Sequence, residues 1–388
     1  MSPPRRSVAL LGATGSIGVQ TLDVLRRERE RFELVSIAGG ERLSELAAIA
    51  AEFDVKSIAV KSEQHRSALI DLVASDVEVV VGDEGLHDLS QRADVIVNAV
   101  MGFAGLPVTL GALGAGKRLA LANKESLIAA APLVAKVRET KGAALLPIDS
   151  EHCAIHQCLA SSPGVVGYPD VRRIVLTASG GPFRGWSADD LKGATKADAL
   201  HHPTWSMGAK ITIDSSTLMN KGLEVLEASA LFGVDVDRID VVVHPQSIVH
   251  SMVEYVDGSV LAQLSRPDMR LPIAYCLGLP ERLTHPYGEL DFSSSLSLSF
   301  EPPDTTAFPA LGLAYEAAPV AGAAPAWLSA ANEVAVAAFL ADEINWCDIV
   351  PIVASTMDHY VADPLDSLSS LYENDDVARR WARASLER

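Results

Sequence analysis

Cysteine is scarce in this chain, and its few thiols form no recognisable framework. Four cysteines occur among 388 residues, and their spacing is neither CxxC nor that of a zinc site: Cys153, Cys158, Cys276 and Cys347. We therefore expect reduced thiols that act as packing residues in a cytoplasmic protein.

Long apolar runs are also missing. No stretch of about 18 uncharged apolar residues occurs, so the sequence predicts no membrane span. The beginning, MSPPRRSVALLGATG, runs directly into a strand-like segment and lacks the apolar core and cleavage site of a signal peptide.

Basic residues are outnumbered by acidic ones. With 32 Lys and Arg against 50 Asp and Glu, the formal net charge is −18. This balance argues against a nucleic-acid partner and against an anionic membrane surface. Its simplest interpretation is a solubilising or salt-adapted surface. A phosphorylated ligand would then need a local cationic pocket or a metal ion.

A regular alternation of strands and helices dominates the first part of the chain. This pattern predicts a doubly wound parallel sheet. The expected strands are residues 7–11, 33–38, 57–60, 77–81, 95–99, 118–122 and 143–148. The length, together with 48% hydrophobic residues, predicts two or three domains.

A glycine-rich turn follows the first strand. Gly12, Gly15 and Gly18 have GxxGxxG spacing between that strand and a helical segment, which predicts a dinucleotide site at a helix N-terminus. The alternative is a purely structural turn. Glu41 and Arg42 follow the second strand and give a mixed signal, because an acid there favours NAD and a base favours NADP.

Dense polar clusters follow two later strands, at the edge where open α/β sheets bind ligands. They are Asn123-Lys124-Glu125-Ser126 and Asp149-Ser150-Glu151-His152. Two carboxylates leaving a strand, with a third from elsewhere, predict an all-oxygen site for Mg²⁺ or Mn²⁺ rather than Zn²⁺. Taken alone, Asp-Ser-Glu is also a common helix N-cap.

The densest polar stretch is residues 201–227, HHPTWSMGAKITIDSSTLMNKGLEVLE. We expect a helix that begins at Ser215–Ser216, with these hydroxyls as N-caps. Asn220 and Glu224 would share one face, with Lys221 beside Glu224. Hydroxyls, Asn and Lys at a helix start suit a phosphate, and the Glu suits a hard metal ion.

Two glycine features accompany this stretch. Gly222, inside the expected helix, costs about 1 kcal/mol relative to Ala, which indicates a close approach by a ligand or by backbone. The Ser179-Gly180-Gly181 turn either offers backbone N–H groups to an anion or is only a turn.

The remainder of the chain predicts three further parts. Asp257-Gly258 indicates a hairpin, so the middle of the chain mixes parallel and antiparallel strands. Residues 275–308 are interpreted as an extended linker. The Ala-rich helical pattern from Ala310 onward predicts a small helical bundle with a structural role.

Nine motifs follow one another along almost the whole chain: GATGSIG, NKES, DSEH, SGGPFR, HPTWSMGAKITIDSSTLMNKGLEVLEA, HPQSIVHSM, DGSVLAQL, PDMRLPIAY and AANEVAVAAFL. In this order they resemble the 1-deoxy-D-xylulose 5-phosphate reductoisomerase family. The resemblance implies an NADPH- and Mg²⁺- or Mn²⁺-dependent isomerisation and reduction of that sugar phosphate. The product would be 2-C-methyl-D-erythritol 4-phosphate, in the non-mevalonate isoprenoid pathway.

The resemblance also implies an architecture, in a homodimer. An N-terminal Rossmann-type domain with a doubly wound parallel sheet would span 1–148. A central α/β catalytic domain with a mixed sheet would span 149–276, with a lid at 201–209. A linker at 277–309 and a C-terminal α-helical domain at 310–388 would follow.

Site residues are implied position by position. The metal ligands would be Asp149, Glu151 and Glu224, and the catalytic set adds Lys124 and His202. The substrate phosphate would be held by Ser179, Ser215, Asn220 and Lys221, with His202 nearby. Further substrate contacts would be Lys124, Ser150, Glu151, Glu224, His250, Met269 and the lid residues Trp205 and Met207. NADPH would contact Thr14, Gly15, Ser16, Ile17, Gly40, Asn123, Glu125 and Gly208, with Glu41 and Arg42 at the positions of the 2′-phosphate.

Two departures from the family pattern stand out. Where the family often has AGKN after the second strand, this chain has GGER, so Glu41 replaces a frequent Lys and Arg42 is left to supply the phosphate contact. The C-terminal motif, often LNAANE with paired glycines, is AGAAPAWLSAANE here, in the structural domain.

Other interpretations stay open. His250, on an apolar strand, is more often a satisfied core residue, and Trp205 and Met207 fit core packing equally well. One alternative function is another Rossmann oxidoreductase, of the semialdehyde or homoserine dehydrogenase kind, and the semialdehyde enzymes would need Cys153 as nucleophile. Another is a catalytically silent dinucleotide sensor, which would bind NADPH without metal dependence.

Overall fold

The computed structural model describes residues 5–161, 168–320 and 322–386. They fall into two compact units. The first contains residues 1–127, 134–153 and 268–288, and the second contains residues 128–133, 154–267 and 289–388.

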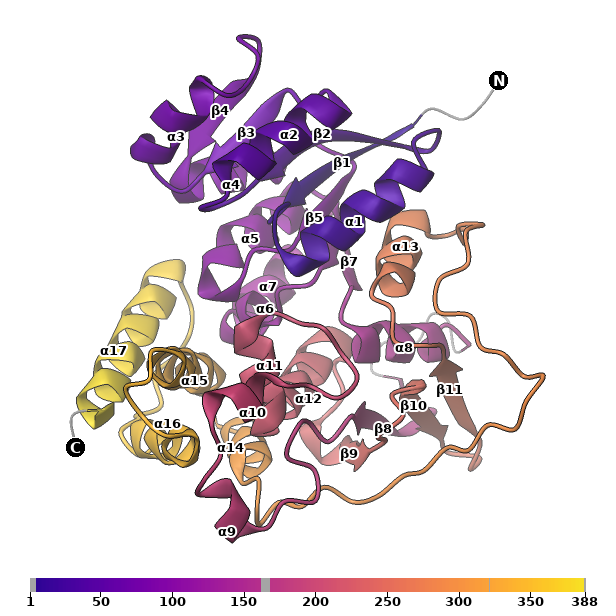
Figure 1. Ribbon diagram of the computed structural model, residues 1–388, viewed down its shortest axis with the longest axis vertical. Helices are drawn as coiled ribbons and strands as arrows, with labels where there is room; N and C mark the ends of the chain where they lie inside the picture. The colour runs from indigo at the N-terminus through magenta and orange to yellow at the C-terminus, as the bar shows by residue number, and fades with distance from the viewer. Residues whose placement is uncertain (1–4, 162–167, 321, 387–388) are drawn as a thin grey trace. The chain divides into compact units, whose positions relative to one another are not determined.

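The first unit is built on a seven-stranded parallel sheet in the order β4-β3-β2-β1-β5-β6-β7 (Figure 1). Its strands are β1 (Arg6–Leu11), β2 (Phe32–Ala38), β3 (Ser57–Val60), β4 (Glu78–Val81), β5 (Val95–Asn98), β6 (Arg118–Leu121) and β7 (Ala144–Pro147). Every strand end lies within one residue of the sequence expectation. The doubly wound sheet is confirmed.

The helices of this unit connect the strands. They are α1 (Ser16–Arg27), α2 (Leu43–Phe53), α3 (Glu63–Ile70), α4 (Gly82–Leu89), the 3₁₀ turn η1 (Gly102–Gly105), α5 (Leu106–Gly114), the first part of α6 (Lys124–Ala129), the second part of α7 (Ala131–Val137) and the start of α8 (Ser150–Leu159). Successive residues of β1, from Val8 to Leu11, are fully buried. Side chains on both faces of the strand are therefore covered, as in parallel sheets with helices on both sides.

A late segment completes the first unit. Helix α13 (Arg270–Gly278) packs Ile273, Tyr275 and Leu277 into the core of this unit. Arg6 Nη1 donates to the carbonyls of Leu277 at 3.0 Å and Leu279 at 2.9 Å, at the end of the helix. The expected linker start at residue 275 is therefore wrong, because burial of these apolar side chains extends the helix to Gly278.

The second unit holds a four-stranded mixed sheet in the order β11-β10-β8-β9. The strands are β8 (Val171–Ala178), β9 (Ile239–Val243), β10 (Val249–Tyr255) and β11 (Val260–Leu264). β8 and β9 are parallel, whereas β10 is antiparallel to β8 and β11, as the hairpin signal predicted. Around the sheet lie α9 (Ala188–Leu191), α10 (Lys196–Leu200), α11 (Ala209–Ser216), α12 (Met219–Phe232) and the 3₁₀ turn η2 (Val236–Arg238).

The C-terminal part of the second unit is helical, as expected from Ala310 onward. It consists of α14 (Ala310–Ala317), α15 (Ala324–Leu340), η3 (Trp346–Asp348), α16 (Ile349–Met357) and α17 (Leu368–Leu386). Helix α15 is buried over most of its length. Gly222 of α12 faces α14 so closely that a Cβ would lie 2.9 Å from the Cβ of Ala314. The close approach indicated by this glycine is therefore helix–helix packing.

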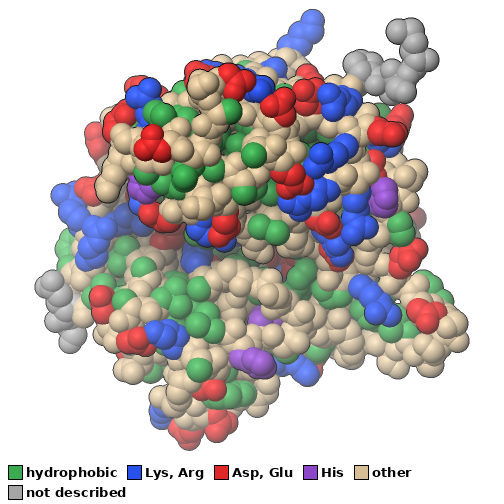
Figure 2. All heavy atoms as spheres, turned by 45° about the horizontal axis from the view of Figure 1, so that its top comes forward, with side chains coloured by type: hydrophobic (Ala, Val, Ile, Leu, Met, Phe, Trp, Pro, Cys, Tyr) green, Lys and Arg blue, Asp and Glu red, His purple; other side chains and the backbone are tan. Residues whose placement is uncertain are grey.

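Charged side chains of both signs lie on the surface. On the face drawn in Figure 2, Lys and Arg side chains are interspersed with Asp and Glu side chains. No helix of the described ranges combines the length and the apolar character of a membrane span.

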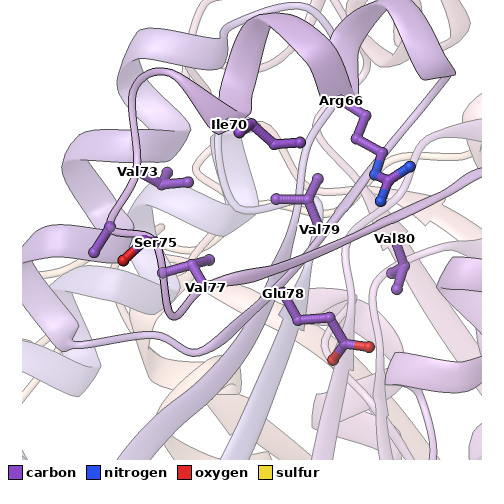
Figure 3. Close-up of a pocket in the computed structure, with 9 residues that line it drawn as sticks. Arg66, Ile70, Val73, Ser75, Val77, Glu78, Val79 and Val80 are labelled. Carbon is purple, nitrogen blue, oxygen red and sulfur yellow. The ribbon is translucent and has the colours of Figure 1, made fainter.

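A cavity of about 430 Å³ lies beside the edge strand β4, between Ile70, Val73 and Val79 among others (Figure 3). None of the predicted site residues lines it. We assign no chemistry to it.

Candidate active site

The glycine-rich turn lies where the strand order of the first unit reverses, between β1 and β5. Gly12 has φ of +102°, and a Cβ there would lie 2.3 Å from the Ala99 carbonyl oxygen. A Cβ at Gly18 would lie 2.3 Å from the Gly12 oxygen. Both glycines are therefore required by close backbone packing. α1 then begins at Ser16, behind Gly15, which has no side chain to cap it. The positive end of this helix suits an anion.

The segment after β2 places Glu41 and Arg42 differently. Arg42 donates to the carbonyl of Thr14, in the glycine-rich turn, and pairs with Glu45 at 3.2 Å. Glu41 is bonded instead by Lys61 and His65, from the segment after β3. Gly40 is exposed, and a Cβ there would meet no atom within 4 Å.

Asn123 organises the loop after β6. Its Nδ2 donates to the carbonyls of Val100 at 2.6 Å and Gly102 at 2.7 Å, while its Oδ1 accepts the Ser126 N–H at 2.8 Å. The side chain is thus committed to joining two loops at the carboxyl edge of the sheet. Glu125 is partly buried beside it.

Asp149 is the centre of a buried ion-pair cluster in the first unit. Its Oδ2 accepts from Lys124 Nζ at 2.7 Å, and its Oδ1 lies 3.0 Å from His152 Nδ1. Burial alone would raise the pKa of Asp149, but the charge of Lys124 and the ring of His152 outweigh it and hold that pKa well below its usual range. The carboxylate is therefore ionised.

The Asp-Ser-Glu sequence also starts a helix, as its alternative interpretation expected. Asp149 Oδ1 accepts the Glu151 N–H at 3.2 Å in the first turn of α8. The Ser150 hydroxyl donates to Glu151. Capping and a dense group of carboxylates thus coexist in one turn.

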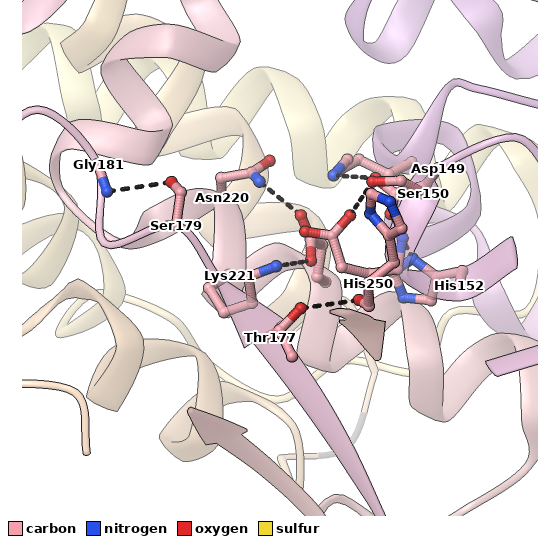
Figure 4. A network of polar contacts seen from close by, with 12 residues as sticks. Asp149, Ser150, His152, Thr177, Ser179, Gly181, Asn220, Lys221 and His250 are labelled. Carbon is pink, nitrogen blue, oxygen red and sulfur yellow. Dashed lines mark hydrogen bonds and ion pairs between the residues drawn. The ribbon is translucent and has the colours of Figure 1, made fainter. Parts of the chain in front are cut away.

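In the second unit, the turn after β8 presents the hydroxyl of Ser179. Its oxygen accepts the Gly181 N–H at 3.2 Å (Figure 4). The same oxygen lies 2.9 Å from His202 Nε2. Nδ1 of His202 accepts the N–H groups of Thr204 at 3.2 Å and Trp205 at 2.9 Å, so Nε2 carries the proton and donates to Ser179. Burial lowers the pKa of His202 to about 4, so the ring is neutral.

This arrangement leaves the Ser179 hydroxyl proton available for an anion, because both of its acceptor positions are used. The Gly181 N–H donates to the Ser179 oxygen. The turn therefore offers an anion the Ser179 hydroxyl rather than a nest of backbone N–H groups. Gly181 has φ of +67°, and a Cβ there would lie 2.5 Å from the Ser215 carbonyl oxygen. The turn is thereby pressed against the end of α11.

The expected helix start at Ser215–Ser216 is wrong. These residues end α11, and the Ser216 hydroxyl donates back to the Ile213 carbonyl at 2.6 Å. Leu218 then takes the left-handed conformation with φ of +62°, and α12 begins at Met219. Side chains from the C-terminal helices fix the end of α11, which local propensity does not reveal.

Glu224 lies inside α12 with both carboxylate oxygens bonded. Asn220 Nδ2 donates to one oxygen and Lys221 Nζ to the other (Figure 4). The side chains of Lys221 and Glu224 are 4% and 1% exposed. The expected face of Asn220, Lys221 and Glu224 is therefore formed, as a buried charged group in the second unit.

Models of one family match three parts of this chain. Residues 8–131 match the 1-deoxy-D-xylulose 5-phosphate reductoisomerase model, and residues 145–232 and 264–381 match two C-terminal domain models of the same enzyme. The 1-deoxy-D-xylulose 5-phosphate reductoisomerase of Chlorobium chlorochromatii (strain CaD3) is 49% identical over 381 residues, which cover 97% of this chain and 98% of that protein. The chain belongs to the 1-deoxy-D-xylulose 5-phosphate reductoisomerase family.

Other members of the reductoisomerase family agree. The protein from Synechocystis sp. (strain ATCC 27184 / PCC 6803 / Kazusa) is 47% identical, over 98% of this chain and 97% of its own. A structure of the Zymomonas mobilis reductoisomerase in complex with NADPH is 42% identical, with a TM-score of 0.91 over 99% of this chain and 100% of that one. A reductoisomerase structure in complex with NADPH, fosmidomycin and magnesium has the same identity and TM-score, over 98% of each chain.

Residues 201–208 carry the segment expected to be a lid of the reductoisomerase. They form no helix or strand before α11, and Trp205 and Met207 are half-buried. The rings of Trp205 and His250 lie 6.1 Å apart. His250 is buried, and its Nε2 lies 2.9 Å from the Ser265 hydroxyl, as a satisfied core residue would.

Sequence reasoning missed the residues that hold α11 in place. Asn332 Nδ2 of α15 donates to Asp214 Oδ1 at 2.7 Å, and Trp346 Nε1 donates to the Ser216 hydroxyl at 2.8 Å. Both C-terminal residues had been assigned to a structural bundle. The only signal available was the polar Asn332 inside an otherwise apolar helix.

The proposed sites for substrate, metal and cofactor divide between the units. The first unit carries Asp149, Ser150, Glu151, Lys124, Met269 and the nucleotide turn, and the second carries Glu224, Ser179, Ser215, His202 and the lid. Cys153 is buried, with 1% exposure, which disfavours it as a nucleophile.

Proposed function

We propose that this chain converts 1-deoxy-D-xylulose 5-phosphate to 2-C-methyl-D-erythritol 4-phosphate, using NADPH and a divalent cation. The observation that carries the proposal is full-length membership of the reductoisomerase family, with a relative that is 49% identical over 97% of this chain. Relatives whose structures contain NADPH and magnesium support the same cofactors.

The carboxylates fit a hard cation. We propose Asp149, Glu151 and Glu224 as its ligands, which gives the all-oxygen donor set that Mg²⁺ and Mn²⁺ prefer. In support, Asp149 is ionised beside Lys124, and Glu224 is buried as a charged group with Lys221.

The second unit supplies the groups for the substrate phosphate. We assign this role to Ser179, Ser215, Asn220 and Lys221, with His202 as the residue that orients Ser179. The support is the Ser179 hydroxyl, whose acceptor positions are used by Gly181 and His202, so that it donates outward. Binding energy from this remote phosphate would help to close Trp205 and Met207 over the substrate and exclude water.

The nucleotide turn of the first unit fits NADPH. Gly12 lets the backbone pack without a Cβ, and the first turn of α1, at Ser16 and Ile17, presents the positive end of a helix. We further assign Thr14, Gly15, Gly40, Asn123, Glu125 and Gly208 to cofactor contacts, with Arg42 at the 2′-phosphate.

When bound, NADPH supplies a hydride and the cation supplies Lewis-acid polarisation of substrate oxygens. The residues of the chain then position the substrate. Lys124 and Ser150 would hold its carbon backbone, and His250 and Met269 would border it.

The decisive experiment follows NADPH oxidation with 1-deoxy-D-xylulose 5-phosphate, with Mn²⁺ and with a chelator. We expect turnover with the metal and its loss with the chelator. NADPH binding without turnover would identify a silent sensor instead. Turnover that survives the chelator would contradict the metal assignment, and turnover blocked by thiol alkylation would favour a Cys153-dependent dehydrogenase.

We also propose a homodimer that uses the second unit. β11 is the outer strand of its sheet and exposes Val260, Leu261 and Leu264. Phe292, Leu296 and Phe300 are exposed in the segment before α14. An exposed apolar edge strand favours pairing with another chain.

The location and the division of the chain are also proposals. We place the protein in the cytoplasm, because all four cysteines are thiols. We keep the functional division into a nucleotide domain at 1–148, a catalytic domain at 149–276, a linker at 277–309 and a helical domain at 310–388.

A further inference from the structure

Besides Arg42, the carboxyl edge of the nucleotide sheet carries two basic residues, Lys61 and His65, that neither the motifs nor the family pattern assign. β2 and β3 run parallel, with Ala38 paired to Ala59, so the segments that follow them emerge side by side. Arg42 comes from the first segment, and Lys61 and His65 come from the second. In dinucleotide-binding sheets the end of this second strand faces the adenosine ribose.

Glu41 lies among these basic residues, and Lys61 and His65 both contact its carboxylate. Its Oε1 accepts from Lys61 Nζ at 3.4 Å, and its Oε2 lies 3.2 Å from His65 Nε2. Nδ1 of His65 lies 2.6 Å from the Ser62 hydroxyl, at the N-cap of α3. Because a carboxylate only accepts, Nε2 carries a proton toward Glu41 and the Ser62 hydroxyl can donate to Nδ1.

Arg42 occupies the other side of this edge. It donates to the Thr14 carbonyl and pairs with Glu45, so its guanidinium lies between the glycine-rich turn and the first turn of α2. Gly40 leaves open space at the same place. The edge therefore offers three basic side chains and room for a ligand.

The hydrogen-bond partners of Glu41 determine whether its carboxylate favours NAD. An acid at this position favours NAD when its carboxylate accepts from the ribose hydroxyls. Here one oxygen is bonded by Lys61 and the other by His65. A phosphate has three strong acceptor oxygens and close to two negative charges, so it competes for the same donors on Lys61 and His65.

Resting on the proposed use of NADPH, we propose that Lys61 and His65 complete the 2′-phosphate site together with Arg42. Without the nucleotide, the Glu41 carboxylate binds Lys61 and His65. The 2′-phosphate displaces this carboxylate from both side chains. Lys61 thereby becomes a specificity-determining residue for NADPH over NADH. The acid in GGER does not turn the site toward NADH.

The test is a direct binding titration of NADPH and NADH to the full-length protein. Lys61→Ala should weaken NADPH binding by about tenfold, the size of one charge-assisted hydrogen bond, and leave NADH binding unchanged. Lys56→Ala is the matched control. Lys56 precedes the first residue of β3, at the end of the strand away from Lys61, and pairs with Asp54 and Asp76. An unchanged NADPH affinity in Lys61→Ala, or an equal loss for both nucleotides, would overturn the proposal.

Glu41→Gln separates displacement from ribose binding. If Glu41 competes with the 2′-phosphate, its neutralisation tightens NADPH binding by about threefold or more and does not affect NADH. If Glu41 bonds the ribose hydroxyls, the same variant weakens NADH binding, which contradicts the proposal.

Binding of two nucleotide fragments tests the role of Lys61 separately from the proposed use of NADPH. Adenosine 2′,5′-bisphosphate and 5′-AMP differ by the 2′-phosphate, so Lys61→Ala should affect only the former. A wild-type protein that binds neither NADPH nor the bisphosphate would refute the proposed use of NADPH. Wild-type preference for the bisphosphate that persists undiminished in Lys61→Ala would refute the role of Lys61 alone.

Discussion

At the residue scale, Glu224 combines complete burial with a charge, which makes its substitution informative. Glu224→Gln should lower turnover by more than about a hundredfold, because a neutral amide is a poor ligand for a hard cation. Loss of a residue that only hydrogen-bonds to a metal ligand usually has a smaller effect. Turnover and NADPH affinity should be measured together, and the affinity should stay near the wild-type value.

Glu281→Gln is the control for this prediction, since Glu281 is exposed and pairs with Arg31. Turnover near the wild-type level in Glu224→Gln would show that the metal assignment is wrong.

His202 provides a prediction about pH. Burial lowers its pKa from 6.5 to about 4, so the folded protein favours the neutral ring while the unfolded chain takes up a proton near pH 6.5. The stability from this group is present above pH 6.5 and is lost as the pH falls toward about 4.

The check is urea unfolding of the wild type and of His202→Gln at pH 7 and at pH 5. The variant should lose less stability between these pH values than the wild type does. An equal loss in both proteins would mean that His202 is protonated normally in the fold.

The arrangement of site side chains could be predicted from the sequence where these residues lie together in one long motif. Asn220, Lys221 and Glu224 were expected on one helix face, and the structure forms that face. The tautomer of His202 was not predictable, because it depends on the backbone N–H groups of Thr204 and Trp205.

At the scale of elements, the turn after β8 depends on its contact with α11. Gly181 and Gly185 both have positive φ, but only at Gly181 would a Cβ meet a neighbour, the Ser215 carbonyl oxygen at 2.5 Å. Gly185→Ala should cost about 1–2 kcal/mol of stability from backbone strain. Gly181→Ala should cost more, and it should also raise the KM for the sugar phosphate.

Steady-state kinetics and denaturant unfolding on both variants provide the comparison. Equal KM values in the two variants would contradict a role for the Gly181 contact in placing Ser179.

The C-terminal helices should affect the chemistry through α11. Trp346→Phe and Trp327→Phe each remove an indole N–H, from Ser216 in the first case and from Asn374 in the second. Each loss should cost about 1 kcal/mol of stability. Only Trp346→Phe should raise the KM, because of the two tryptophans it is Trp346 that bonds α11, the helix that leads to the phosphate residues.

Identical kinetics in the two tryptophan variants would restore the view that the bundle is purely structural. KM and the free energy of unfolding are the two quantities to measure.

The elements themselves were largely predictable, and their exceptions have a physical cause. Strands of the parallel sheet are apolar runs between turn residues, and their ends were placed within one residue. The end of α11 and the start of α12 were misplaced, because Trp346 and Asn332 act on α11 from more than a hundred residues away along the chain. Local hydroxyls suggested a cap, but tertiary hydrogen bonds decide the outcome.

At the scale of the whole molecule, β11 predicts the oligomeric state. Replacement of Leu261 and Leu264 by Lys together should place charges on the exposed edge strand and prevent pairing between copies. Sedimentation should give twice 41.1 kDa for the wild type and the single value for the variant. Val256→Lys, at an exposed position beyond β10, is the control and should remain dimeric.

A wild-type protein that sediments as a monomer would refute the dimer, and a variant that stays dimeric would exclude β11 as the contact.

Helix α13 determines when the first unit can complete its fold during synthesis. Its core residues Ile273 and Leu277 belong to the same hydrophobic core as β1, although more than 260 residues separate them from Val8. The first unit therefore cannot complete its core until residue 278 has left the ribosomal tunnel. The nascent nucleotide sheet therefore leaves part of its apolar core uncovered while residues 154–267 of the second unit are made, and such an exposed surface is prone to aggregation.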